Sequence, residues 1–282
     1  MSGDNEHFTY CYGQLKHQQL MLECSSRMEK YNAAFLRNMV NYSNKIVMDV
    51  GAGTGILSLF ALQAGAKKVI SVEASRMADY AKRLVQANGY ENKCEVIQKK
   101  VENVCTEGHQ VDVIVSEPIG FLLVHERMLE SFVSARDKFL SPSKLNRSSM
   151  VPNSATIHVT LFTDAKLHGE QINRASLWNS KNFYGIDISC LKDDAEKENF
   201  SQVFIGNVDV DSLLSDQVSS HSIDFTSVSI NEIQSFEIPL SVKVNQTGIL
   251  HGLVCWFDVE LIGGNLRNIG YVFPGTYSQD TI

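Results

Sequence analysis

Two glutamates, Glu117 and Glu126, stand nine positions apart in a segment that directly follows an apolar run ending at Val115. A loop at the end of a strand can turn two such carboxylates toward a common point. Converging carboxylates suit a flat, permanently charged guanidinium, whose donors lie in a fixed fork. The alternative is that both are solvated surface acids, which is the commoner place for glutamates. The elements around the loop decide between these interpretations.

The composition limits the classes of protein to consider. The 282 residues suffice for one large or two medium domains, and 44% apolar with 20% charged residues is typical of a soluble globular protein. The net charge of −7 argues against direct nucleic-acid binding and is compatible with basic, arginine-rich partners. The six cysteines lack metal-site spacing, so we expect reduced thiols, no metal, and a location in the nucleus and cytoplasm. We expect no membrane partner, because no apolar run reaches the length of a span.

Strand-like and helix-like segments alternate through the first half of the chain. Apolar runs typical of buried strands cover residues 46–50, 69–73, 94–99 and 111–116. Helical patterns cover residues 7–40, 56–63, 76–88 and 127–139. Such alternation predicts an α/β fold, with a parallel sheet that helices cover on both faces.

The pattern changes near residue 141, where a loop leads to strand-like runs after Pro152. Alternating strand-like runs cover residues 156–161, 223–225, 236–238, 242–244 and 253–261. They predict an antiparallel β domain. Residues 165–203 interrupt it and are predicted to form a helical excursion.

A glycine-rich turn follows the first predicted strand, and its glycines are Gly51, Gly53 and Gly55. Glycines there let the backbone approach a ligand closely. Glu73 ends the second strand about twenty residues later, where an acid can hold the two hydroxyls of a ribose. Ile56 stands where a dinucleotide fingerprint has its last glycine, which favours S-adenosylmethionine over NAD.

A third acid, Glu102, follows the third predicted strand. It could accept the exocyclic amine of an adenine, with Val101 beneath the ring. A solvated surface acid is the equally good alternative for Glu102 alone.

The stretches 49–58 and 72–75, together with the two-glutamate loop, resemble the protein arginine methyltransferases. Residues 126–131 and the pair Gln18-Gln19 are most similar to the coactivator-associated type, and the resemblance covers about residues 8–262. It implies a Rossmann-like methyltransferase domain and an antiparallel β-barrel, complete or incomplete. The implied parts are cofactor-capping helices at 1–45, the methyltransferase domain at 46–150, and a barrel domain at 151–282 with a dimerisation arm at about 165–203.

The resemblance also implies roles for single residues. Glu117 and Glu126 would be catalytic. Arg27 would meet the carboxylate of S-adenosylmethionine, and Met21 and Met128 would flank the methyl-transfer path, as in enzymes that make asymmetric dimethylarginine. The implied cofactor-binding residues are Tyr12, Gln18, Met21, Arg27, Asp49, Gly51, Gly53, Gly55, Glu73, Val101, Glu102, Met128 and Ser131.

The implied substrates are arginines of proteins such as histones or other nuclear and RNA-binding proteins. The implied assembly is a homodimer through the arm, or a heterodimer with a homologue. Glu126→Gln is expected to abolish turnover nearly completely.

Two features depart from the family's pattern. Cys24 stands where the family has an aspartate, and no Thr-His-Trp sequence follows Trp256. Two interpretations remain open. The chain can be a truncated form of an active enzyme, or a divergent paralogue that acts as a catalytically weak, dimerising scaffold.

Overall fold

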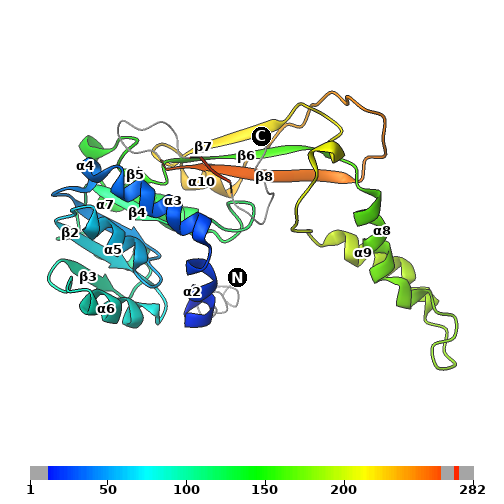
Figure 1. The fold of residues 1–282 in the computed structure, drawn as a ribbon, viewed down its shortest axis with the longest axis horizontal. Coiled ribbons are helices and arrows are strands. Elements are labelled where there is room, and N and C mark those ends of the chain that lie inside the picture. The colour runs from blue at the N-terminus through cyan, green and yellow to red at the C-terminus, as the bar shows by residue number, and fades with distance from the viewer. Residues whose placement is uncertain (1–11, 262–269, 273–282) are drawn as a thin grey trace. The chain divides into compact units, whose positions relative to one another are not determined.

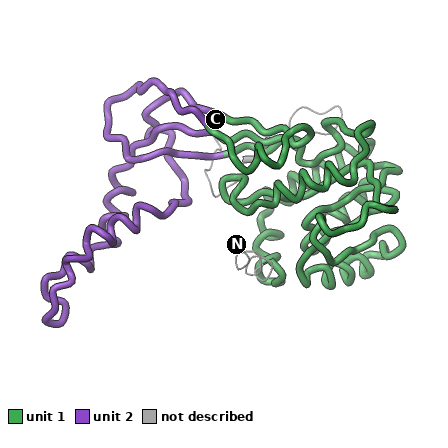
Figure 2. The backbone as a smooth tube through the Cα atoms, turned by 180° about the vertical axis from the view of Figure 1, so that it is seen from behind, with its two compact units in different colours: residues 1–157, 221–237, 257–272 green, residues 158–220, 238–256, 273–282 purple. Residues whose placement is uncertain are grey.

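The structure is a computed structural model that describes residues 12–261 and 270–272 (Figure 1). The chain divides into two compact units, drawn in different colours in Figure 2. Unit 1 comprises Met1–Ile157, His221–Glu237 and Phe257–Val272, and unit 2 comprises the remaining segments. Two segments from the second half of the chain therefore belong to unit 1. The functional division at residues 45 and 150 stays a prediction.

The central sheet of unit 1 has five parallel strands in the order β3-β2-β1-β4-β5. They are β1 (Ile46–Val50), β2 (Lys68–Val72), β3 (Cys94–Ile97), β4 (Val113–Ser116) and β5 (Met150–Val151). This arrangement confirms the predicted parallel sheet. The two-residue strand β5 was not predicted, because so short a run has no recognisable period.

Helices pack against this sheet on both sides. The helices before and between the strands are α2 (Leu15–Leu22), α3 (Ser25–Leu36), α4 (Met39–Tyr42), α5 (Ile56–Gln63), α6 (Met77–Ala87) and α7 (Met128–Phe139). Helix α6 packs on β3, and α3 packs on α5. Helix α5 packs on β1 and β2, and α7 packs on β4. Successive strand residues point to opposite faces, so Val47 and Met48 can both be fully buried, one on each face.

The second sheet has the strand order β7-β6-β8-β9. Its strands are β6 (Ser154–Phe162), β7 (Ser219–Asp224), β8 (Gly252–Glu260) and β9 (Gly270–Val272), and β8 pairs with β9 antiparallel. Closure of this sheet into a barrel stays a prediction.

The predicted strands at 236–238 and 242–244 are wrong, because residues 236–251 form no regular structure. Pro239 follows the first of them and lacks the N–H donor that a strand ladder needs. In the second, the backbone N–H of Lys243 donates to the Gln217 side chain at 2.8 Å instead of to a neighbouring strand.

The excursion at 165–203 is helical, as predicted. It contains α8 (Ala165–Arg174) and α9 (Lys192–Ser201), joined through the short 3-10 turns η3 (Ser176–Asn179) and η4 (Ser189–Leu191). Other 3-10 turns are η1 (Val101–Asn103), η2 (Pro142–Lys144) and η5 (Val210–Ser212). Helix α10 (Ile230–Gln234) was not predicted, and it belongs to unit 1. None of the helices in the described part of the chain has the length and apolarity that a membrane crossing requires.

Helix α3 depends on the burial of Phe35, which is 0% exposed and stacks on Tyr42 with ring centroids 4.7 Å apart. We predict that Phe35→Ala lowers the free energy of unfolding by about 3–5 kcal/mol, since it leaves a cavity in a packed core. Chemical denaturation measures this loss. The neighbouring Leu36 is 43% exposed, so Leu36→Ala should change the same quantity by less than about 1 kcal/mol. Equal losses in the two variants would contradict the assignment of Phe35 to the core.

Candidate functional site

The loop between β4 and α7 is tightly turned. The N–H of Leu123 donates to the carbonyl of Gly120 at 2.9 Å, and this closes a hairpin-like turn. Leu122, Leu123 and Arg127 all have positive φ, at 45°, 68° and 59°. Such backbone is unfavourable for residues with a side chain, so surrounding contacts must hold the loop in this form.

Gly120 allows the loop to close on Glu126. A Cβ at residue 120 would lie 2.5 Å from Cγ and 2.6 Å from Cβ of Glu126. Both distances are shorter than real carbon contacts, so any side chain at residue 120 would displace Glu126. The glycine is therefore part of the geometry of this acid.

Four side chains gather around the loop. Glu117 Oε1 lies 3.4 Å from Nη1 of Arg27 in α3, and the two side chains are 19% and 17% exposed. The hydroxyl of Tyr12, just before α2, donates to Oε2 of Glu126 at 2.8 Å. The loop thus brings both predicted catalytic acids to one cluster with an arginine and a tyrosine.

The electrostatics of this cluster show that its members interact. Burial raises the pKa of Glu117 to about 7, Arg27 opposes that rise, and Glu126 adds to it through like-charge repulsion. The pKa of Tyr12 is also raised, first by burial and then by Glu126, because an ionised phenol beside a carboxylate is unfavourable. The two carboxyl groups are therefore close enough to perturb each other.

The glycine turn lies within contact distance of two other predicted site residues. Its three glycines, Gly51, Gly53 and Gly55, all have positive φ. A Cβ on Gly51 would come within 2.6 Å of Met128 Cε, and one on Gly53 within 2.7 Å of Gln18 Oε1. A side chain at either position would displace the end of Met128 or Gln18, and the positive φ disfavours it in any case.

Glu73 is held at the end of β2 by two backbone donors. Its Oε2 accepts from the N–H of Gly53 at 2.8 Å, and its Oε1 accepts from the N–H of Ser75 at 2.7 Å. The side chain is 9% exposed. Each carboxylate oxygen has a second lone pair, so this fixed acid can still accept from a ligand.

Asp49 is fully buried in β1. Its Oδ2 accepts from the hydroxyl of Ser58 at 2.7 Å, whereas no described group hydrogen-bonds to Oδ1. Burial raises the pKa of Asp49 to about 7, the hydrogen bonds from Ser58 lower it, and Glu73 raises it. Asp49 thus lies in the electrostatic field of the predicted ribose acid.

Side chains of α7 hydrogen-bond to the turn η1 and to the residue that follows it. Oε1 of Glu102 accepts from the hydroxyl of Ser131 at 2.6 Å, and Val101 beside it is buried. Nζ of Lys138 donates to the carbonyls of Glu102 and Val104 at 2.9 and 2.6 Å.

The remaining predicted residues lie on the first helices. Gln18 in α2 is 6% exposed, and its Nε2 donates to the carbonyl of Tyr12 at 2.9 Å. Met21 is half-buried in the same helix, and Cys24 directly precedes α3.

Sequence reasoning missed two supporting contacts. The hydroxyl of Tyr31 donates to the carbonyl of Ser116 at 3.1 Å, and Nε of Arg76 donates to that of Gly13 at 2.8 Å. No local pattern marks such contacts, since the partners are far apart in the chain.

Comparisons with known proteins extend this picture. Residues 153–268 match the family model of the arginine methyltransferase oligomerization subdomain, and residues 31–131 match that of the ribosomal protein L11 methyltransferase. The solved Trypanosoma brucei PRMT1 enzyme-prozyme heterotetrameric complex with AdoHcy is 32% identical, with a TM-score of 0.79 over 93% of this chain and 78% of that chain. The chain belongs to the protein arginine methyltransferase family.

Other arginine methyltransferases match over nearly the whole chain. Protein arginine methyltransferase 10 of Arabidopsis thaliana is 29% identical, with a TM-score of 0.81 over 96% of this chain and 81% of that one. The histone-arginine methyltransferase CARMER of Drosophila grimshawi is 41% identical over 95% of this chain and 48% of its own length. The chain thus spans about half the length of the curated arginine methyltransferases that it matches.

We predict that Glu126→Gln lowers the pKa of Glu117, because it removes the negative charge that destabilises a second carboxylate nearby. Arg27→Met should raise it, since the stabilising cation is lost. Carboxyl-carbon NMR titration of the labelled protein measures both changes. An unchanged pKa in the Glu126→Gln variant would show that the two acids are too far apart to interact.

Proposed function

We propose that this chain is a protein arginine N-methyltransferase that moves methyl groups from S-adenosylmethionine to guanidinium groups of proteins such as histones, with asymmetric dimethylarginine as product. The cluster of Glu117 and Glu126 beside Arg27 and Tyr12 carries this proposal. The names of the matched histone-arginine methyltransferases support it.

The residues present fit S-adenosylmethionine. Glu73 is oriented by two backbone donors and retains acceptor capacity for ribose hydroxyls. Glu102 and Val101 would hold the adenine, and Arg27 would pair with the carboxylate, since a guanidinium has donors for more than one partner. The others that would line the site are Tyr12, Gln18, Met21, Asp49, Gly51, Gly53, Gly55, Met128 and Ser131. When bound, the cofactor would supply an electrophilic methyl group on a sulfonium.

The two glutamates would prepare the substrate nitrogen. An arginine side chain is a poor nucleophile, because its charge is delocalised and its pKa exceeds about 12. Glu117 and Glu126 would grip the guanidinium and draw its positive charge away from one nitrogen. The carboxylate of Glu117 would accept the proton that this nitrogen gives up on methylation. Alignment and exclusion of water would provide most of the rate.

We propose that unit 2 provides the assembly surface, as a homodimer through the arm or a heterodimer with a homologue. The match of residues 153–268 to an oligomerization subdomain supports this role. The arm also exposes large apolar side chains, among them Leu177 at 54% and Ile186 at 63%. We expect Arg-containing proteins as substrates, a location in the nucleus and cytoplasm, and no membrane or direct nucleic-acid partner.

A second candidate is a catalytically weak scaffold. Cys24 at a position where the family has an aspartate favours it, and so does the enzyme-prozyme pairing of the trypanosomal complex. Calorimetry with S-adenosylmethionine, combined with methyl-transfer assays on histone and Gly-Arg-rich peptides, separates the two. Cofactor binding without transfer, even beside a homologous partner, would support the scaffold.

We predict that Glu126→Gln lowers methyl transfer by at least about a thousandfold, because it keeps the shape of the side chain and removes the charge that holds the guanidinium. Cofactor affinity measured by calorimetry should stay within about threefold of the wild-type value. Wild-type transfer rates in this variant would rule out the proposed role of Glu126.

The pH dependence should follow Glu117. Its charged form binds the guanidinium, and burial raises its pKa to about 7. Protonation below that pH removes the charge, so kcat/KM for the peptide should fall about tenfold per pH unit below about pH 7 and level off above it. Asp49 has a similar raised pKa. The Asp49→Asn variant tests which of the two acids is responsible, and it should keep the inflection of the pH profile near pH 7. If the inflection disappears in that variant, the pH dependence belongs to Asp49 instead of Glu117.

A further inference from the structure

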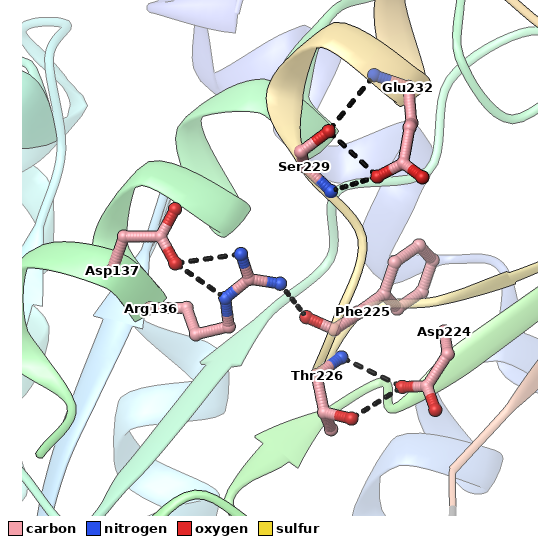
Figure 3. Close-up of polar contacts among 7 residues, drawn as sticks. All are labelled: Arg136, Asp137, Asp224, Phe225, Thr226, Ser229 and Glu232. Atoms are coloured by element: carbon pink, nitrogen blue, oxygen red, sulfur yellow. Dashed lines mark hydrogen bonds and ion pairs between the residues drawn. The ribbon is translucent and has the colours of Figure 1, made fainter. Parts of the chain in front are cut away.

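The segment 221–237 comes after the arm in the sequence but folds as part of unit 1. A capping box stabilises the N-terminus of its helix α10 (Figure 3). In this box the N–H of Ser229 donates to Glu232 Oε2 at 2.8 Å, and the N–H of Glu232 donates to Ser229 Oγ at 3.3 Å. Before it, Oδ1 of Asp224 accepts from the N–H of Thr226 at 2.8 Å. Local hydrogen bonds therefore fix the conformation of this segment before and at the start of α10.

This segment packs along α7. Arg136 in α7 is 7% exposed, and its Nη1 donates to the carbonyl of Phe225 at 2.7 Å (Figure 3). The ring of Phe225 packs edge-on against Phe132 of α7 with centroids 5.9 Å apart. Ile233 of α10 is also buried, and α10 packs on α7.

The same segment reaches the first turn of α7. Nε2 of Gln234 donates to Oε2 of Glu130 at 2.9 Å. Glu130 in turn receives a fork from Arg127, with Nε to Oε1 at 2.7 Å and Nη2 to Oε2 at 2.9 Å. This chain of contacts, Gln234–Glu130–Arg127, ends at the residue that directly follows Glu126.

The backbone of Arg127 has an unfavourable conformation. It precedes α7 with φ at 59°, a left-handed conformation that is unfavourable for a residue with a side chain. Its side chain forks onto Glu130, and Gln234 of α10 donates to the same carboxylate. On its other side Glu126 lies against Gly120.

We propose that Glu130 and Gln234 are positioning residues, which hold Glu126 in place through Arg127. Neither belongs to the set that would touch cofactor or guanidinium. The expected effect of these two residues on the methyl-transfer rate rests on the proposed function. Their expected effect on the loop that carries Glu126 does not, because it can be measured without any reaction.

Hydrogen exchange of the full chain tests the effect on the loop. In Gln234→Leu, amides of residues 120–130 should exchange at least about fivefold faster, because the Glu130 carboxylate loses its donor and the fork loosens. Amides of α10 should keep their protection, since the capping box is intact. Gln234→Lys retains a donor for Glu130 and should restore most of the loop's protection. Asn231→Ala, an exposed change on the same helix, is the matched control and should leave the loop unchanged.

Kinetics test the effect on catalysis. Gln234→Leu and Glu130→Gln should each lower kcat for an arginine peptide about tenfold, with KM for S-adenosylmethionine and the melting temperature nearly unchanged. Wild-type loop exchange and wild-type kcat in Gln234→Leu would overturn the proposal, as would equal effects of Asn231→Ala. If the wild-type chain transfers no methyl group, the proposed function fails, and the exchange measurement still decides whether Gln234 holds the loop.

Discussion

The constraint on which the site depends is the approach of two partly buried carboxylates that repel each other. Desolvation and mutual repulsion both disfavour the charged form of Glu117, and the pKa of about 7 expresses that cost. Arg27 offsets part of the cost through its ion pair, and Tyr12 donates to the second acid. Two neighbouring carboxylates whose charge is only partly compensated favour a cation that can hydrogen-bond to both. A guanidinium has the shape and the donors to do so.

Parallel strand topology explains how distant residues come to one place. The carboxyl ends of parallel strands lie at the same edge of the sheet, which is where such folds bind ligands. The glycine turn follows β1, Glu73 follows β2, and Glu117 follows β4, and these strands are neighbours in the sheet. The helices before β1 then contribute Tyr12 and Arg27. The site is thus a consequence of strand order combined with short loops.

The parallel sheet could be predicted from the sequence, because apolar runs and helical patterns are local signals. The contact of Tyr12 with Glu126 could not, since its partners are separated by 114 positions and only the fold joins them. The predicted strands near residue 240 are wrong because a short alternating pattern competes there with Pro239 and with side-chain contacts. Helix α10 does carry a local signal, the Ser229-x-x-Glu232 capping box, but this signal stands within a segment dominated by strand-like runs.

The central claim is that both acids act together on a cation. The most direct measurement is the affinity for an arginine peptide relative to the same peptide with citrulline, the neutral analogue, in the presence of S-adenosylhomocysteine. The account predicts a preference of at least about tenfold for arginine in the wild-type protein, because hydrogen bonds to charged groups contribute about 1.5–3 kcal/mol. It also predicts that the preference disappears when Glu117→Gln and Glu126→Gln are combined. Equal affinity for the two peptides in the wild-type protein, or an unchanged preference in the double variant, would contradict it.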